Sequence, residues 1–424
     1  MQSDLSVTAP DTVPAGRPRT LALVLAIFIL GFAIRIFVAI FFWGSEDVTV
    51  QIYHAWRIRE GHSAWTSKLP IAYYAPRLAL EIALQTRFPE HASHKLPAIL
   101  GDMLVAVLLL RIATRRGSPR RWLWPAVYLL NPATVTLSAY HGNIDPLMAA
   151  AMLWALDLRW REKPIAAGAS LGLALAMKPT AILQLPALMI PLRAKGNIRL
   201  ALAALGVLAA ICLPFLLTDP EFGRFLTGYG GAYGEWGITL LMRNLDQNLA
   251  SRLAFLPGGV AGMLHTANTM LEQHGRYLLA AVLAAWFLYA LRRWRSLDFE
   301  ENARVIAATY LVFFVFATGF GPQYLSLVIP FLIIASLRLS VFYLAVLSPY
   351  LIVTYMFSWA FKKYEGQRVF DRLGTLPKSD VFLLLANRGL TVVAWAAGAW
   401  VLWRLLRQKN AGTQPEELRP RGSR

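Results

Sequence analysis

The fold is decided by residues 20–43, TLALVLAIFILGFAIRIFVAIFFW, an apolar run that ends just before Glu46 and Asp47. A helix needs about 20 apolar residues to cross a bilayer. The run is too long for the apolar segment of a signal peptide and lacks a small-residue cleavage site, so we expect a retained first transmembrane helix. The acidic pair then lies where this helix leaves the bilayer, a position suited to chemistry rather than to packing.

The composition predicts an all-α polytopic membrane protein. Of the 424 residues, 57% are hydrophobic and only 16% are charged, so lipid rather than water must surround most of the surface. We expect one transmembrane domain, residues 20–407, between cytoplasmic tails at 1–19 and 408–424. The lone Cys212 lies in an apolar run, which excludes an internal disulfide and a cysteine metal site.

The net charge of +18 does not indicate nucleic acid binding. The basic residues form short clusters between apolar runs, which is the pattern that orients helices in a membrane. With these clusters in the cytoplasm, both termini lie inside and about twelve spans follow. The expected spans lie near residues 20–43, 95–111, 122–139, 143–158, 163–178, 179–193, 197–217, 275–291, 304–318, 321–337, 339–358 and 385–405.

This topology leaves three outer loops, near residues 44–94, 218–274 and 361–380. In the first loop, residues 48–60 and 73–88 combine helical apolar spacing with charges, which is typical of helices that lie in the membrane interface.

Polar residues gather at the outer ends of the expected helices. They are Glu46 and Asp47, the turn His141-Gly142-Asn143-Ile144-Asp145-Pro146, Lys178, and Gln323 with Tyr324. None of them was needed to set the topology. Because polar groups near membrane depth are costly, those that occur there are candidates for a function. We therefore expect an outward-facing active site at the membrane edge.

Several motifs in the first half of the chain resemble those of the GT-C glycosyltransferases, multi-span enzymes that use polyprenyl-phosphate sugars. The similarity is carried by the acidic pair after the first helix, by Leu129-Leu130-Asn131-Pro132 with the turn 141–146, by residues 95–102, and by residues 173–179 with Lys178. Tyr74-Ala75-Pro76 departs from the Tyr-Pro-Pro common in such loops. Among these enzymes the chain looks most like dolichol-phosphate-mannose-dependent mannosyltransferases and their bacterial relatives.

The resemblance implies a GT-C-like bundle, and its chemistry requires one carboxylate. A polyprenyl phosphate leaves as a stable anion, so no acid is needed, and a base accepts the proton of the acceptor hydroxyl in an inverting single displacement. We assign Asp47 as this base, with Glu46 in reserve. Because no Asp-x-Asp spacing and no Walker loop occurs, we do not expect nucleotide-sugar or ATP-driven chemistry. His141 and Asp145 have a spacing that could begin a metal site, but no third ligand is suggested, so we expect no metal and no other cofactor.

The donor phosphate needs cations, and Lys178 is the first candidate, although its side chain could merely snorkel to the interface. Arg35, inside the first apolar run, must have a partner: the donor phosphate, or Asp102 or Asp145 in a structural pair. Lys363, with Lys362 and Arg368, forms an outer basic patch that could hold phosphate or simply be solvated.

The remaining candidates have two interpretations each. Asn143 and Asp145 could bind sugar hydroxyls or cap the next helix. In the stretch GYGGAYGEWG, residues 228–237, the rings of Tyr229, Tyr233 and Trp236 could stack on a sugar or belong to an aromatic belt at the membrane surface. Gln323 and Tyr324 likewise could either contact the substrate or have a structural role alone.

The leading hypothesis is an enzyme that moves a hexose, mannose in the first instance, from a polyprenyl-phosphate carrier to a lipid-linked or cell-envelope acceptor. We expect it in a bacterial inner membrane with its active site outside the cytoplasm. The alternatives are a lipid or oligosaccharide transporter or flippase, whose polar residues belong near the midplane, and an enzyme of the O-antigen ligase or polymerase type.

Overall fold

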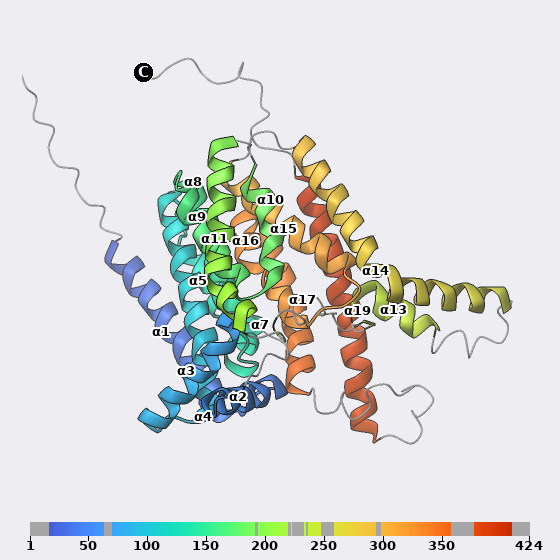
Figure 1. Ribbon diagram of the computed structural model, residues 1–424, viewed down its shortest axis with the longest axis horizontal. Helices are drawn as coiled ribbons and strands as arrows, with labels where there is room; N and C mark the ends of the chain where they lie inside the picture. The colour runs from blue at the N-terminus through green and yellow to red at the C-terminus, as the bar shows by residue number, and fades with distance from the viewer. Residues whose placement is uncertain are drawn as a thin grey trace, which may run out of the picture.

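The computed structural model describes residues 17–62, 70–190, 194–218, 222, 233–234, 236–246, 258–293, 298–357 and 377–408. These residues form helices and no strand; two of them, Tyr233 and Gly319, make an isolated antiparallel bridge. The expected all-α fold is confirmed. Helices run roughly side by side in a bundle, and a smaller layer of helices closes one end (Figure 1).

The first half of the chain begins with the long helix α1 (Arg17–Phe41) and the end layer α2 (Glu46–Arg59), α3 (Pro70–Thr86) and α4 (Glu90–Ser93). The bundle continues through α5 (Leu96–Arg115), α6 (Leu123–Leu129), α7 (Pro132–Val135), the π-helix η1 (Thr136–Tyr140), α8 (Asp145–Trp160), α9 (Pro164–Leu175), the 3₁₀-helix η2 (Pro179–Gln184), α10 (Leu185–Leu188) and α11 (Ala194–Thr218).

The second half comprises α13 (Gly237–Asn244), α14 (Gly258–Arg293), α15 (Phe299–Phe316), the 3₁₀-helix η4 (Pro322–Ser326), α16 (Ile329–Ala335), α17 (Leu337–Met356) and α19 (Lys378–Arg407). Among the described residues, six helices are long and apolar enough to cross a membrane: Arg19–Phe41, Glu90–Arg115, Lys195–Thr218, Gly262–Arg293, Leu337–Met356 and Lys378–Arg407. The other expected spans fall on shorter helices or on helices interrupted by a break.

The expected outer loop at residues 218–274 contains helices. Both α13 and the first part of α14 fall within it, and α14 projects sideways from the bundle before it joins the other helices (Figure 1). The polar residues Thr266, Glu272 and His274 interrupt the apolar pattern of this helix without ending it. At residue 378, α19 likewise begins inside the expected loop 361–380.

Small residues set how closely the helices approach. Gly168 and Gly172 lie one turn apart on α9 and face α11, where an added Cβ would collide with the carbonyl oxygens of Leu200 and Ala204. Such glycine pairs allow close backbone contact between helices in lipid, where burial of apolar surface gives little driving force. Gly101 of α5 meets the start of α8 in the same way.

A buried ion pair ties α1 to its neighbours. Arg35 and Asp102 are fully buried and lie 2.7 Å apart. The guanidinium also donates to the carbonyl oxygens of Gly31 and Leu129 and to the hydroxyl of Thr134, and Tyr128 donates to the second oxygen of Asp102. Every charge in this network is therefore paired, which is the condition for burying it.

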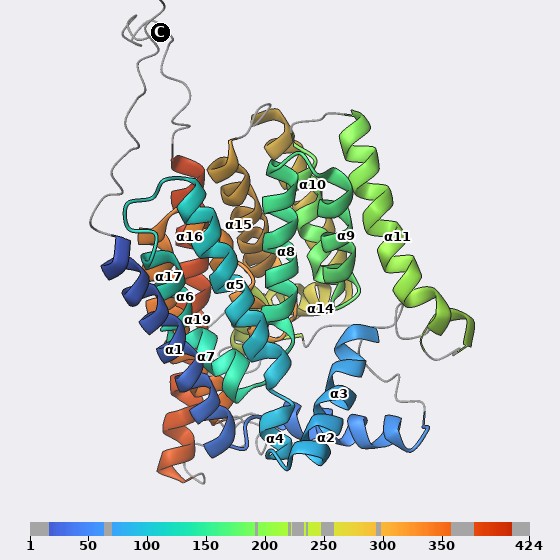
Figure 2. The same ribbon diagram turned by 90° about the vertical axis from the view of Figure 1, so that its left-hand side faces the viewer.

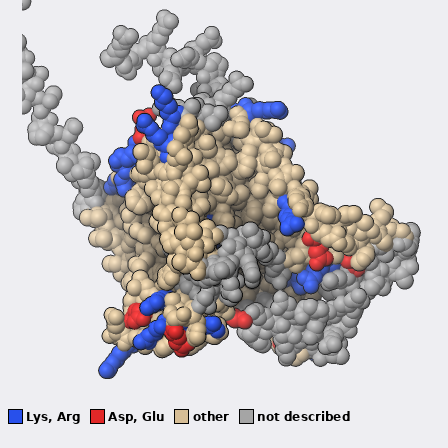
Figure 3. All heavy atoms as spheres, in the orientation of Figure 1, with Lys and Arg blue, Asp and Glu red and all other residues tan. Residues whose placement is uncertain are grey.

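Charged residues gather in three places on the face shown in Figure 3. Lysine and arginine lie at the end where α8, α9 and α11 approach one another, and mixed charges cover the α2–α4 layer. A further group of both signs lies at mid-height, beside the projecting part of α14. The bundle surface between the two ends is otherwise largely uncharged where Figure 3 shows it, which is typical of a protein whose middle lies in lipid.

Candidate active site at the end of the first helix

The acidic pair begins α2, immediately after a sharp turn. Gly44 has φ +106°, a conformation that favours glycine, and an added Cβ would collide with the carbonyl oxygen of Tyr140. Ser45 follows in extended conformation, and Glu46 and Asp47 occupy the first turn of the helix. Carboxylates are favoured there because the N-terminal end of a helix carries partial positive charge.

Asp47 lies against a buried histidine. The Oδ2 atom of Asp47 is 3.3 Å from Nε2 of His141, whose side chain is 3% exposed while that of Asp47 is 44% exposed. The other ring nitrogen of His141, Nδ1, lies 2.7 Å from the hydroxyl of Ser45, and the ring of Tyr355 packs on the imidazole at a centroid distance of 4.0 Å. One side of the Asp47 carboxylate thus meets a fixed ring, and the side chain remains accessible to a substrate.

The segment before the turn places His141. The π-helix η1 leads directly into His141, and π-turns recur at functional sites because the extra residue changes the direction of the following side chains. Gly142, with φ +70°, completes the turn against the Lys95 side chain, and Gln51 of α2 donates to its carbonyl oxygen at 3.2 Å. Helix α2 and the turn are therefore bonded to each other.

Lys178 ends the same polar chain. Its ammonium lies 2.5 Å from Oδ1 of Asp145 and donates to Oδ1 of Asn143 at 3.0 Å, and it lies 4.5 Å from the ring centroid of Tyr324. The amide nitrogen of Asn143 in turn lies 3.4 Å from Nε2 of His141. A continuous row of polar contacts therefore runs from Asp47 through His141 and Asn143 to Lys178, whose side chain is 15% exposed.

The segment after α15 joins the site from the second half of the chain. The Gln323 carbonyl accepts a hydrogen bond from the hydroxyl of Tyr355 at 2.7 Å, and Tyr324 supports Lys178 as described. Asp47, His141, Asn143, Asp145, Lys178, Gln323 and Tyr324, all expected at the outer helix ends, thus lie in one connected cluster. Glu46 lies beside Asp47 and is exposed.

Arg35, a candidate for binding the donor phosphate, requires a correction. It is fully buried, and its guanidinium is bonded to Asp102, to backbone carbonyls and to Thr134. The structural pair with Asp102, which the sequence left open, is the arrangement found.

The two described aromatic residues of the glycine-rich stretch also differ from the stacking interpretation. Trp236 is 2% exposed, donates to the carbonyl oxygen of Phe314, and packs on Phe320 and Tyr350. The hydroxyl of Tyr233 donates to Asn268 of α14, and burial raises the pKa of this hydroxyl above its ordinary value. Trp236 is therefore packed inside the bundle and cannot form a sugar platform, whereas the hydroxyl of Tyr233 ties its segment to α14. Tyr229, Lys362, Lys363 and Arg368 lie outside the described residues.

Two residues of the site were not predicted from the sequence. Ser45 bonds to His141, and Tyr355 covers the imidazole. Ser45 could have been suspected because a serine directly before an acidic helical turn is a typical N-cap, whereas Tyr355 lies in an apolar helix with no local signal. Within the described part of the chain, no group of three histidine, cysteine, aspartate or glutamate residues could hold a metal ion.

A sequence model of glycosyltransferase family 87 matches residues 73–319. The chain belongs to this family. The match includes His141, Asn143, Asp145 and Lys178, and it begins after Asp47. The predicted glycosyltransferase class is thereby confirmed for this family 87 protein.

Solved structures show a related fold. The apo crystal structure of ArnT from Cupriavidus metallidurans is similar to the family 87 protein with a TM-score of 0.50 and 15% identity, over 92% of this chain and 76% of ArnT. The structure of the same protein bound to undecaprenyl phosphate gives a TM-score of 0.48 and 14% identity, over 93% and 78% of the two chains. No curated protein matches the sequence. The expected GT-C-like architecture is confirmed.

Proposed function

We propose that this family 87 glycosyltransferase moves a hexose, with mannose the first candidate, from a polyprenyl-phosphate carrier to a lipid-linked or cell-envelope acceptor. The site would face the extracytoplasmic side of a bacterial inner membrane. The observation that carries the proposal is the row of contacts from Asp47 through His141 and Asn143 to Lys178. It places a half-exposed carboxylate and a lysine at the two ends of one cluster.

In the proposed reaction, Asp47 accepts the proton of the acceptor hydroxyl as the hydroxyl oxygen forms a bond to the anomeric carbon of the sugar. The bond from that carbon to the phosphate oxygen breaks on the opposite face, and the polyprenyl phosphate leaves with the electron pair. The anomeric configuration is inverted. Because the phosphate departs as a stable anion, the reaction requires a base but no general acid.

Lys178 is proposed to stabilise the departing phosphate. Its partner Asp145 and the ring of Tyr324 fix the ammonium in place, so a phosphate oxygen can be met without reorganisation of the lysine. Asn143, bonded to both Lys178 and His141, would set the spacing between the phosphate end and the base end of the site.

His141 is proposed as a positioning residue. It touches Asp47 rather than the reacting atoms, and Ser45 and Tyr355 hold its ring. A fixed imidazole beside the carboxylate would hold Asp47 in one orientation toward the acceptor hydroxyl.

Two observations support a lipid phosphate donor. The cluster lies where the membrane-length helices α1 and α17 end, so a donor anchored in the bilayer can reach it. ArnT, whose apo structure has a related fold, has been crystallised with undecaprenyl phosphate. The transporter alternative is not favoured, because the chain belongs to a glycosyltransferase family and its polar cluster gathers at helix ends.

The decisive experiment is a donor panel. Purified full-length protein is incubated with polyprenyl phosphates carrying radiolabelled mannose, glucose or galactose and with membrane lipid extract as acceptor. We expect transfer from the mannose donor and none from GDP-mannose. Transfer from the nucleotide sugar, or from none of the lipid donors, would refute the proposal.

A further inference from the structure

Lys95 is a fully buried lysine beside the two turns that carry the acidic pair and His141. It directly precedes α5, and its ammonium donates to the carbonyl oxygens of Phe42 at 2.6 Å and of Ala39 at 3.2 Å, at the end of α1. Among the described residues, no carboxylate lies within ion-pair distance of this ammonium. A buried cation whose partners are carbonyl groups alone is costly, so Lys95 does more than fill space.

The ammonium caps the end of α1. The last carbonyl groups of a helix have no partner within the helix, and the negative end of the helix dipole favours a cation. Gly44 turns the chain directly after this end and leads into α2. Because the cap comes from the start of α5, it fixes the point at which the chain leaves α1 relative to α5.

The aliphatic part of the Lys95 side chain packs against both turns of the site. A Cβ atom added to Gly44 would lie 3.1 Å from Cε of Lys95, and one added to Gly142 would lie 3.0 Å from its Cγ. Val48 of α2 also packs against both glycines, but a valine side chain cannot bond to the carbonyl groups of α1. Lys95 therefore sets the spacing of the two turns and ties both of them to the end of α1.

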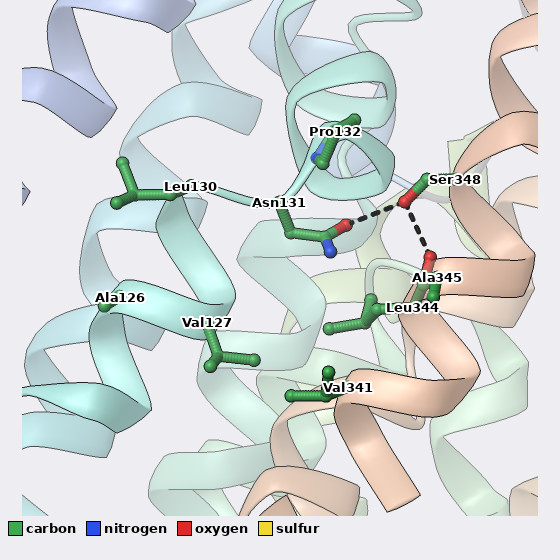
Figure 4. Close-up of a pocket in the computed structure, with 9 residues that line it drawn as sticks. All are labelled: Ala126, Val127, Leu130, Asn131, Pro132, Val341, Leu344, Ala345 and Ser348. Atoms are coloured by element: carbon green, nitrogen blue, oxygen red, sulfur yellow. Dashed lines mark hydrogen bonds between the residues drawn. The ribbon is translucent and has the colours of Figure 1, made fainter. Parts of the chain in front are cut away.

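The two sides of the site are held by different elements. The segment that leads to His141 is anchored far from Lys95, where Ser348 of α17 lies 3.3 Å from the side chain of Asn131, the residue that caps α7 (Figure 4). At the other side, α4 and the start of α5 lie beside the ends of α1 and α2 (Figure 2). The contacts of Lys95 join these two sides next to the proposed base.

We propose that Lys95 is a positioning residue for sugar transfer, which holds the turn before Asp47 and the turn after His141 at a fixed separation. The inference rests on the proposed function and adds to it a residue that touches neither the substrate nor the reacting atoms. Misplacement of a reacting group by about 1 Å can cost about 10²-fold in rate. Loss of the ammonium should therefore lower kcat without weakening donor binding at Lys178.

The first test removes the ammonium and keeps the aliphatic stem. Lys95→Met should lower kcat about 10- to 100-fold while KM for polyprenyl-phosphate mannose stays within about threefold. Lys95→Arg keeps a cation that can donate to the carbonyl groups, and it should recover part of the rate. If Lys95→Met does not fold, Lys95→Gln, whose amide can donate to one carbonyl group, is measured in its place with the same expectation.

His91→Ala is the matched control. The Nε2 atom of His91 lies 3.0 Å from the carbonyl oxygen of Ile40, at the same end of α1, so this variant removes a neighbouring contact to the helix end but leaves Lys95 in place. It should retain near wild-type kcat. An equal loss of kcat in His91→Ala and Lys95→Met would show that Lys95 acts only as a helix cap and would overturn the inference. A change in Lys95→Met that is confined to KM for the donor would also overturn it.

The second test needs no turnover, so it separates failure of this inference from failure of the proposed function. Hydrogen–deuterium exchange is followed by mass spectrometry on the full-length wild type, Lys95→Met and His91→Ala in detergent. The backbone amides of Val48, His141 and Asn143 are hydrogen-bonded within the two turns. We expect Lys95→Met to speed exchange about tenfold in the segments 44–48 and 141–145, and His91→Ala to leave the second segment unchanged. Unchanged exchange in either segment of Lys95→Met overturns the inference even if transfer is observed.

Discussion

The Nε2 atom of His141 lies 3.3 Å from Oδ2 of Asp47 and so joins the turn after a π-helix to the first turn of α2. A buried ring beside a half-exposed carboxylate restricts the orientation of that carboxylate. The contact fixes the orientation of Asp47 while its side chain stays 44% exposed, which is the arrangement that a base toward an incoming hydroxyl requires.

Asp47→Asn should lower kcat for sugar transfer by about 10²- to 10⁴-fold, the usual contribution of general-base catalysis. The amide preserves the shape of the side chain but cannot accept the proton. Glu46→Gln is the matched control, because Glu46 belongs to the same helical turn and is exposed, and it should retain near wild-type activity. Initial rates at saturating donor and acceptor measure both. If the two variants had equal rates, Asp47 would not be the base.

His141→Ala should lower kcat while leaving KM for the donor within about threefold, because the imidazole acts through Asp47. Loss of a well-placed hydrogen bond to a charged group costs about 1.5 to 3 kcal/mol, or roughly 10- to 100-fold. His141→Gln should recover part of the rate, since its amide can still donate to the carboxylate. Ser45→Ala, which removes the partner of Nδ1, should have a smaller effect of the same kind. A change confined to KM would instead assign His141 to substrate binding.

Lys178→Met should raise KM for the polyprenyl-phosphate donor by about 10- to 100-fold through loss of a charge-assisted contact. Lys178→Arg keeps the charge and should be milder. Asp145→Asn tests the support of the lysine, because it removes the ion pair and leaves the ammonium present. Steady-state kinetics, with the donor concentration varied at a fixed acceptor concentration, distinguish the three variants. If Lys178→Met left KM for the donor unchanged, Lys178 would not bind the donor phosphate.

Arg35→Leu should destabilise the protein by about 3 to 5 kcal/mol, because Asp102 would remain as an unpaired buried charge. The double variant Arg35→Leu/Asp102→Leu should recover part of this loss, since both charges disappear. Thermal unfolding of the purified protein in detergent provides the measurement. The kcat and KM values of the folded fraction should stay close to those of the wild type. A rise in KM for the donor alone would instead indicate that Arg35 binds the donor phosphate.

Charge distribution and apolar spacing were enough to predict the class of fold, and they grouped polar residues that the structure brings together at one end of the bundle. Short basic clusters fix which helix ends share a side of the membrane, so Asp47, Asn143 and Lys178 could be grouped although they lie far apart in sequence. Counting the spans shows on which side of the membrane a helix end lies, but it does not show which face of the helix points toward a neighbouring helix. The contacts of His141 with Ser45 and Tyr355 depend on the extra residue of η1 and on the direction of α17.

Two features of the structure could not be predicted from the local sequence. The ring of Trp236 was open to two interpretations because its packing partners Phe320 and Tyr350 come from segments far along the chain. The first part of α14 was not predicted because its polar residues Thr266, Glu272 and His274 interrupt the apolar signal of a span. The packing of Trp236 depends on tertiary contacts that a local pattern does not contain.

The network around Arg35 also bears on biogenesis. During synthesis α1 leaves the ribosome before α5, α6 and α7, so the arginine enters the translocon before Asp102, Leu129 and Thr134 exist to receive it. Translocon-based scales put a lone arginine at mid-helix at about 2.5 to 3.5 kcal/mol. The first helix therefore reaches its final position only when the later helices arrive, and the order of synthesis makes assembly of this end of the bundle a cooperative, post-insertion event.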